Sequence, residues 1–261
     1  MLPIQPTLSV AYLQLDIAWH NPKANRQRID QLTASLPMSV DLLFLPEMFT
    51  TGFTMEPKEV GEPMQGDSVQ WMKDFARRKD ILLGGSVVIK EGDHFVNRFL
   101  FVFPGGQLEY YDKRHLFNHA GEGDHYFPGQ IRKIITWKGW RIMPMVCYDL
   151  RFPVWSRNNL DYDMLVYVAN WPEPRIHHWD QLLLARAIEN QCYTLGVNRT
   201  GVDGYDMTYI GHSRMVSFDG SLLQQADHLE GVYYAELDLE KMKAYRNTFS
   251  FLKDGDTFQI Q

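Results

Sequence analysis

Short runs of apolar and β-branched residues recur along the whole chain, and polar segments separate them. Runs of this length, bounded by turn-forming residues, predict buried strands. We expect eleven strands, at 8–15, 40–45, 81–89, 97–103, 106–113, 132–137, 141–147, 163–169, 193–198, 212–218 and 232–237. Several of these runs are apolar at nearly every position rather than alternating, which is typical of a sheet that is covered on both faces.

Three further segments, 24–36, 67–78 and 177–190, carry apolar residues at helical spacing. The segment after Pro153, 153–160, indicates a fourth and shorter helix. No linker or repeat divides the chain, so we expect a single α/β domain over residues 1–261. Eleven strands exceed what one open sheet carries comfortably, and two packed sheets with helices outside are the expected arrangement.

The composition narrows the classes of partner. The chain has a formal net charge of −6 and no long basic run, which argues against nucleic acid and anionic membranes as partners. The N-terminal segment lacks the basic region of a secretion signal, and no apolar run is long enough to span a bilayer. We therefore expect a cytoplasmic protein, in which the two cysteines are reduced thiols.

One carboxylate stands at a conspicuous place. The stretch VDLLFLPEMF, residues 40–49, ends an apolar strand at a proline and then presents Glu47. Taken alone, this pattern has two interpretations: the simple end of a strand, or a base that is held rigidly beside a pocket.

A cysteine occupies a similar place. The strand 141–147 ends in Cys147, and a turn then leads into the segment after Pro153. Helix N–H groups near such a turn favour a thiolate and can hold a developing oxyanion, although free cysteines are more often inert core residues. We interpret the neighbouring Asp149 and Arg151 as a structural ion pair that supports the turn. Cys192, in an apolar stretch, is interpreted as a core residue.

Lys113 ends the strand 106–113, where a fixed cation could stabilise a negative intermediate, although most lysines are solvated surface charges. Together, Glu47, Lys113 and Cys147 would supply what amide cleavage needs. The thiol attacks a carbonyl carbon, the carboxylate takes its proton and returns it to the leaving ammonia, and the ammonium stabilises the oxyanion. The sequence alone does not show that the three side chains converge.

Two alternatives of other classes stay open at this point. The segment HLFNHAGEGDH offers a set of possible metal ligands: His115, His119, Glu122, Asp124 and His125. Its glycines favour a loop, and no HExxH pattern is present, so we expect no metal. We also expect no cofactor, because no glycine-rich phosphate-binding motif occurs, and no serine hydrolase, because no G-x-S-x-G elbow occurs. The second alternative is a protein of the same two-sheet architecture that has no enzymatic activity and functions by binding a partner.

Three segments in this order, LPEMF, DKRHLF and VCYDLRFP, resemble the signature segments of the nitrilase (carbon–nitrogen hydrolase) superfamily. GEGDHYFPG, ANWPEPR and the late GHSRMVSFDG extend the resemblance over nearly the whole chain, which looks most similar to the bacterial omega-amidase branch. The resemblance implies a four-layer αββα sandwich and a homodimer or larger homo-oligomer.

The resemblance also implies roles for individual residues. Glu47 would be the general base, Lys113 the oxyanion stabiliser and Cys147 the nucleophile that forms a thioester. Glu122 matches a second glutamate that positions the substrate and the lysine. The backbone N–H of Tyr148 would be the other oxyanion donor.

The substrates that the branch implies are omega-amido 2-oxo acids such as 2-oxoglutaramate and 2-oxosuccinamate, which yield a dicarboxylate and ammonia. Such a substrate needs a cation for its distal carboxylate, and we expect Arg175 to supply it, with a surface arginine as the alternative. Phe53 and Trp171 are expected to wall the pocket, unless they only pack in the core. The same chemistry on an N-carbamoyl amino acid, an aliphatic amide or a nitrile is the alternative function.

Overall fold

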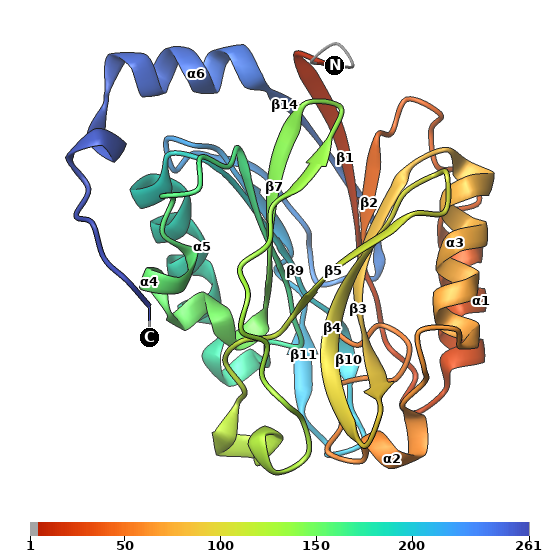
Figure 1. Ribbon diagram of the computed structural model, residues 1–261. Helices are drawn as coiled ribbons and strands as arrows, with labels where there is room; N and C mark the ends of the chain where they lie inside the picture. The colour runs from red at the N-terminus through yellow and green to blue at the C-terminus, as the bar shows by residue number, and fades with distance from the viewer. Residues whose placement is uncertain (1–4, 261) are drawn as a thin grey trace.

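Two six-stranded sheets pack face to face, and helices cover the outer face of each (Figure 1). The computed structural model describes residues 5–260 of the chain. The four layers, from right to left in Figure 1, are a helix layer, the two sheets and a second helix layer. The prediction of an αββα sandwich is therefore confirmed.

The first sheet has the strand order β14-β1-β2-β3-β4-β5. Its strands are β1 (Thr7–Gln14), β2 (Leu42–Phe44), β3 (Leu82–Glu91), β4 (His94–Val102), β5 (Leu108–Asp112) and β14 (Gly231–Asp238). The strands β1, β2 and β3 are parallel, so the chain must cross over between them. The helices α1 (Pro22–Leu32) and α3 (Asp67–Lys79) make these crossovers and cover the outer face.

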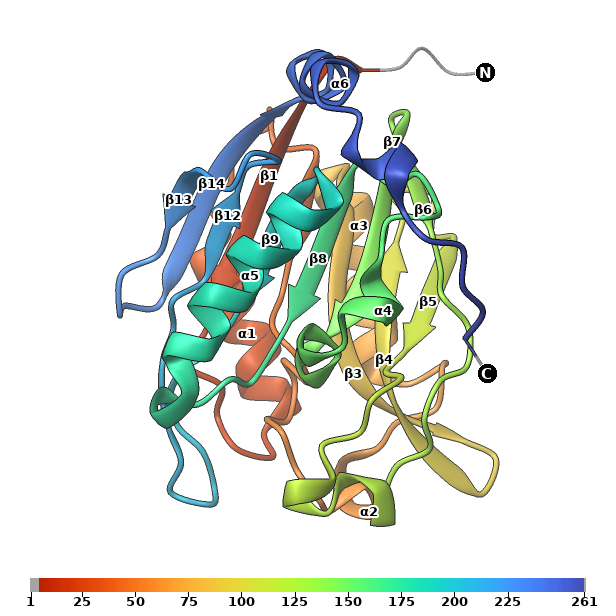
Figure 2. The ribbon, with the colours of Figure 1, turned by 90° about the vertical axis from the view of Figure 1, so that its left-hand side faces the viewer.

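The second sheet has the order β13-β12-β9-β8-β7-β6. Its strands are β6 (Ile135–Trp137), β7 (Trp140–Val146), β8 (Met164–Val168), β9 (Tyr193–Val197), β12 (Arg214–Val216) and β13 (Leu222–Gln225). The strands β7, β8 and β9 are parallel. The short α4 (Pro153–Ser156) and the long α5 (Ile176–Asn190) lie over the outer face, with α5 in front of the sheet in Figure 2.

Smaller elements complete the fold. They are α2 (Pro57–Val60), α6 (Leu239–Thr248), the two-stranded sheet of β10 (Thr200–Val202) and β11 (Thr208–Ile210), and the 3₁₀ turns η1 (Asn118–Ala120), η2 (Glu122–Asp124), η3 (Cys147–Arg151), η4 (Glu173–Arg175) and η5 (Phe251–Asp254). Of these elements, η3 directly follows β7 and η4 directly precedes α5, and both contribute residues to the candidate site.

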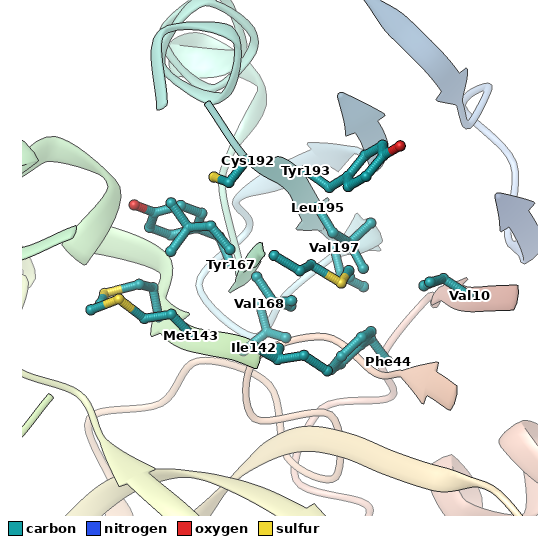
Figure 3. Packing of buried hydrophobic residues seen from close by; sticks show 14 of the residues in the cluster. Val10, Phe44, Ile142, Met143, Tyr167, Val168, Cys192, Tyr193, Leu195 and Val197 are labelled. Atoms are coloured by element: carbon teal, nitrogen blue, oxygen red, sulfur yellow. The ribbon is translucent and has the colours of Figure 1, made fainter. Parts of the chain in front are cut away.

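The main core fills the space between the sheets. Phe44 of the first sheet lies opposite Ile142 and Val168 of the second, and all three side chains are fully buried (Figure 3). Because each sheet is covered on both faces, its central strands are apolar at nearly every position, as the sequence predicts. Cys192 lies among the same buried side chains, which confirms its interpretation as a core residue.

Every one of the eleven expected strands is present, with ends that differ by a few residues. The helix expected over 153–160 is wrong in length, because α4 ends at Ser156. The side chain of Asn158 instead bonds to the backbone of Tyr162 and Asn190, which holds the following residues as a loop. Residues 5–260 contain no helix that is both long and apolar enough to cross a membrane. The cytoplasmic location and the homo-oligomer stay predictions.

Candidate active site

The carboxyl ends of parallel strands meet at one end of the sandwich, and the three predicted catalytic residues lie there. Glu47 follows β2, Lys113 follows β5 and Cys147 follows β7. In the first sheet β2 and β5 run in the same direction, since two antiparallel pairings separate β3 from β5. The strand ends therefore bring together side chains that lie far apart in the sequence.

Glu47 is fully buried, and hydrogen bonds hold both of its carboxylate oxygens. Oε1 accepts from Lys113 Nζ at 3.0 Å and from Asn97 Nδ2 at 2.8 Å, and Oε2 accepts from the backbone N–H of Asn170 at 2.8 Å. Asn170 also donates from Nδ2 to the carbonyl of Glu47 at 2.7 Å. Such a network fixes the orientation of a base, which general base catalysis requires.

Lys113 lies between two carboxylates. Its Nζ is 2.8 Å from Glu122 Oε2 and 3.0 Å from Glu47 Oε1, and all three side chains are fully buried. Burial disfavours the charged ammonium, but Glu122 and then Glu47 outweigh it and raise the pKa of Lys113 above its ordinary value. Lys113 is therefore a permanent cation at this site at neutral pH.

Glu122 completes the buried cluster of ionisable groups. Burial raises its pKa, against the opposing effect of Lys113. Its Oε2 also accepts from the backbone N–H of Phe117 at 2.5 Å, so the loop that carries Glu122 is tied to the segment that follows Lys113. Glu122 thus lies in contact with Lys113, and its supporting role in catalysis stays a prediction.

Cys147 begins the 3₁₀ turn η3 with a backbone φ of +44°. This left-handed conformation is uncommon for a residue with a Cβ, and such strain is concentrated at functional sites. The thiol is half-buried, and its Sγ lies 3.9 Å from the carbonyl oxygen of Asn170. Burial, and after it Glu47, raises the pKa of the Cys147 thiol well above its ordinary value, while Lys113 opposes the rise. The resting thiol is therefore protonated and needs a base.

The predicted ion pair between Asp149 and Arg151 is wrong. The buried carboxylate of Asp149 accepts instead from the His115 ring Nδ1 at 2.7 Å, from the Tyr111 hydroxyl at 2.7 Å and from the Val146 N–H at 3.0 Å. Asp149 thus ties the turn that holds the nucleophile to the segment that follows Lys113. In the tight η3 turn the two side chains diverge, and the guanidinium of Arg151 lies 4.8 Å from the ring of Trp171.

A cavity of about 360 Å³ opens over Cys147. Its walls are mostly apolar and aromatic, with a few polar groups: Phe53, Met55, Phe117, Ala120, Cys147, Tyr148, Arg151, Asn170, Trp171, Pro172, Arg175, Asp203, Tyr205, Met207 and Tyr209. All four predicted substrate-binding residues, Phe53, Tyr148, Trp171 and Arg175, line it. Glu47, Lys113 and Glu122 lie behind the cysteine, within the buried cluster.

The loop that offered metal ligands does not gather them. His115 is engaged with Asp149. Among residues 5–260, the one group of three metal-binding side chains with mutually close ligand atoms is His20, Glu56 and Glu59, whose carboxylates are exposed. The zinc hydrolase alternative, which depends on the 115–125 loop, therefore has no assembled ligand set in the described part of the chain.

Sequence reasoning missed Asn97 and Asn170, which hold Glu47 in place. Each is a polar residue next to or inside an apolar strand run, NRFLFVF for Asn97 and LVYVAN for Asn170. A buried amide in a core strand needs partners of its own, so these positions carried a signal that a polar network lies beneath them.

The fold and this cluster define a class of protein, namely an αββα hydrolase with a cysteine, a lysine and glutamates gathered at the strand ends. The family model described as carbon–nitrogen hydrolase matches residues 9–247. The chain therefore belongs to the carbon–nitrogen hydrolase family, the nitrilase superfamily, as its three motifs predict.

Similar proteins agree with this assignment. The omega-amidase YafV of Yersinia enterocolitica is 47% identical, over 97% of this chain and 99% of its own. The 2-oxoglutaramate amidase of Bacillus subtilis is 31% identical, over 94% and 96% of the two chains. A crystal structure of a superfamily protein from Xanthomonas campestris, with an arsenic adduct in its active site, superposes with a TM-score of 0.96 at 39% identity, over 98% of this chain and 100% of the other. These matches confirm the predicted omega-amidase branch and an amidohydrolase function.

Proposed function

We propose that this amidohydrolase cleaves the terminal amide of omega-amido 2-oxo acids, such as 2-oxoglutaramate and 2-oxosuccinamate, to a dicarboxylate and ammonia. The observation that carries the proposal is a cavity in which a thiol, backed by a buried Glu–Lys–Glu cluster, shares one space with arginine side chains. The names of the two relatives above, an omega-amidase and a 2-oxoglutaramate amidase, support the same substrate class.

In the acylation half-reaction, Cys147 Sγ attacks the amide carbon while Glu47 takes the thiol proton. Since the thiol is protonated at rest, this transfer must accompany the attack. The carbonyl oxygen becomes an oxyanion that Lys113 and the backbone N–H of Tyr148 stabilise. Glu47 then returns the proton to the amide nitrogen, the carbon–nitrogen bond breaks, and ammonia leaves a thioester on Cys147.

In the deacylation half-reaction, water attacks the thioester carbon and Glu47 takes the proton of that water. The second tetrahedral intermediate uses the same oxyanion donors. Its collapse breaks the carbon–sulfur bond, releases the new carboxylic acid, and returns the proton to the thiolate. Glu122 holds Lys113 in place through both half-reactions, because it bonds to the lysine and not to the reacting atoms.

The distal carboxylate of the substrate needs a cation at the other end of the cavity. Arg175 and Arg151 both line the cavity. Within residues 5–260 neither forms an ion pair with an aspartate or glutamate side chain, and the guanidinium of Arg151 bonds to the His178 ring Nδ1 at 3.1 Å. Arg175 lies 5.3 Å from the ring of Phe117, and its own backbone carbonyl accepts from Trp171 Nε1 at 2.8 Å. These contacts leave the guanidinium of Arg175 available for a bidentate bond to the substrate carboxylate.

Ammonia release tests the proposal. Wild-type protein is compared on 2-oxoglutaramate and on butyramide, an amide that lacks the carboxylate. We expect Arg175→Ala to lower kcat/KM for 2-oxoglutaramate by about 10- to 100-fold, since charged hydrogen bonds contribute roughly 1.5–3 kcal/mol, and to leave butyramide unchanged. Arg77→Ala, at an exposed position on α3, is the matched control. Folded wild type that releases no ammonia from 2-oxoglutaramate would overturn the proposed substrate class.

A further inference from the structure

The side chain of Asp149 is fully buried, and hydrogen-bond donors surround both of its carboxylate oxygens. Oδ2 accepts from the Tyr111 hydroxyl at 2.7 Å and from the backbone N–H of Val146 at 3.0 Å. Oδ1 accepts from the ring Nδ1 of His115 at 2.7 Å and from the backbone N–H of the same residue at 3.0 Å. A buried polar network in which every group is satisfied is rigid, so this carboxylate holds its neighbours in one arrangement.

The donors to Asp149 belong to two different sheets. Tyr111 lies two residues before Lys113 and His115 lies two residues after it, around the end of β5 in the first sheet. Val146 ends β7 in the second sheet and directly precedes Cys147. The carboxylate is therefore a bridge across the sandwich, from the segment of the lysine to the turn of the nucleophile.

The hydroxyl proton of Tyr111 must point to Asp149. The hydroxyl oxygen already accepts from Trp155 Nε1 at 2.9 Å and from the backbone N–H of Arg114 at 3.2 Å. Burial, and after it Asp149, raises the pKa of Tyr111 well above its ordinary value, so the hydroxyl keeps its proton at neutral pH. Removal of this one oxygen would therefore break a bond across the sandwich without a change of charge.

The chemistry requires a fixed distance across this bridge. The oxyanion forms on the carbon that Cys147 attacks from the second sheet, whereas the ammonium of Lys113 comes from the first. Lys113 is anchored in its own sheet, where its backbone N–H donates to the carbonyl of Asn97 at 3.0 Å. Its distance from the thiol therefore depends on how the ends of the two sheets are joined. A displacement of about 1 Å between such groups can lower a rate by about 10²-fold.

We propose that Asp149, with Tyr111 as its donor, is a positioning residue that holds the turn of Cys147 and Tyr148 at the distance from Lys113 that the oxyanion requires. Loss of the bridge then lowers kcat in a protein that stays folded and keeps its thiol accessible. The inference rests on the amidase chemistry above, in which Lys113 and the N–H of Tyr148 stabilise the oxyanion. It does not depend on the acyl chain of the substrate.

Tyr111→Phe tests the bridge with the smallest change, because it removes one oxygen and leaves the ring in the core. Tyr162→Phe is the matched control. Tyr162 is also fully buried, and its hydroxyl donates to the carbonyl of Ser156, which belongs to the helix layer of the second sheet. Each substitution removes a buried hydroxyl and its hydrogen bond, and denaturant unfolding compares their effects on the fold. Only Tyr111→Phe weakens the bridge between the sheets.

Two rates separate a positioning role from a structural one. Ammonia release measures kcat, and alkylation by iodoacetamide at pH 7 measures the reactivity of the Cys147 thiol without an oxyanion. We expect Tyr111→Phe to lower kcat by about tenfold and Asp149→Asn by about 10²-fold, with alkylation within about threefold of wild type. Tyr162→Phe should keep kcat within about twofold of wild type.

Wild-type kcat in folded Tyr111→Phe protein would overturn the inference and make Asp149 a structural residue alone. Equal losses of hydrolysis and alkylation would also overturn it, because the thiol itself would then be disturbed. This decision does not require Asp149→Asn to fold.

Two substrates separate the inference from the proposed substrate class. Both variants are compared with wild type on 2-oxoglutaramate and on butyramide, which lacks the carboxylate, and the bridge predicts the same fold-loss of kcat on each. A loss on butyramide, together with no turnover of 2-oxoglutaramate by wild type, would overturn the proposed substrate class but support the bridge.

Discussion

The two cysteines of this protein lie at opposite ends of the same sheet. Cys147 follows the carboxyl end of β7, and Cys192 precedes the amino end of β9. Burial is the largest cause of a raised pKa at both thiols, and it raises the pKa of Cys192 to about 12. With a raised pKa, neither thiol is activated by being unusually acidic.

Their surroundings differ in every other respect. Cys192 has the Thr194 hydroxyl 3.7 Å from its sulfur and otherwise lies in the apolar core. Cys147 has Glu47 and Lys113 behind it and the cavity in front. The comparison teaches that reactivity in this fold comes from a base that can take the thiol proton during attack, not from a thiolate that exists beforehand.

The largest expected effect separates the two thiols by activity. Cys147→Ala removes the nucleophile, and we expect kcat for amide hydrolysis to fall by about 10⁴-fold or more. Cys192→Ala, the matched substitution in the core, should keep kcat within about threefold of wild type, since Cys192 contacts no group of the site. Ammonia release from 2-oxoglutaramate measures both variants.

A loss of activity in Cys147→Ala counts only if the variant folds. Circular dichroism and a melting curve check this. If Cys147→Ala kept substantial activity, the nucleophile would have to be another group, and the contrast between the two cysteines would lose its chemical meaning.

The second effect concerns the base. Glu47→Gln keeps the shape and the acceptor oxygen of the side chain but cannot take a proton, so we expect kcat to fall by about 10²- to 10⁴-fold. The same change should speed alkylation of Cys147 by iodoacetamide at pH 7. The reason is that Glu47 raises the pKa of the Cys147 thiol and Lys113 lowers it, so removal of the carboxylate favours the thiolate. Glu236→Gln, on the exposed face of β14, is the control.

Opposite signs for catalysis and alkylation are the informative result. A thiolate-based mechanism would instead predict that the variant with the more acidic thiol is the better enzyme. If Glu47→Gln slowed both alkylation and hydrolysis, Glu47 would deprotonate the thiol already in the resting enzyme. The difference between Cys147 and Cys192 would then lie in a thiolate that exists before the substrate binds.

Much of the site could be predicted because each catalytic residue is marked by the short stretch of sequence around it. Glu47, Lys113 and Cys147 each stand where an apolar run ends, and a strand end is the place from which a side chain can reach a pocket. The interpretation of Asp149 and Arg151 failed for a related reason. Nearness in sequence suggested a pair, but a 3₁₀ turn sends neighbouring side chains in different directions.

Other features depended on packing that no single segment reveals. Asn97 is 50 residues from Glu47, and Asn170 is 123 residues away, on the opposite sheet. The strands β10 and β11 are three residues each and carry no apolar run, and α6 buries only Leu239 and Met242, so its apolar face is too narrow to stand out. Such elements form because the rest of the fold presents a surface to them.

The third effect is the pH dependence of thiol labelling in native protein. Because the pKa of Cys147 is raised well above its ordinary value, its thiolate fraction is small at pH 7 and grows about tenfold per pH unit below that pKa. We expect the iodoacetamide rate at Cys147 to rise without a plateau from pH 7 to about 9. Cys192, which is fully buried, should react only after unfolding. Mass spectrometry of the two cysteine peptides measures both rates, and a plateau near pH 7 would contradict the raised pKa.

The smallest effect concerns the free energy of unfolding, and we expect glycine and alanine substitutions to rank in opposite order at the two cysteines. Cys147 has a φ of +44°, a conformation that glycine adopts freely and that costs other residues about 1–2 kcal/mol. We therefore expect Cys147→Gly to be more stable than Cys147→Ala, by about 1 kcal/mol after the greater entropy of glycine in the unfolded chain is subtracted. At Cys192, which has no such strain, the glycine variant should be the less stable by roughly the same amount. Denaturant unfolding of the four variants measures these differences. If the alanine variant were the more stable one at both positions, the turn would hold Cys147 without backbone strain. If glycine is the more stable at position 147 and alanine at position 192, the backbone conformation of the reactive cysteine destabilises the fold and that of the inert cysteine does not.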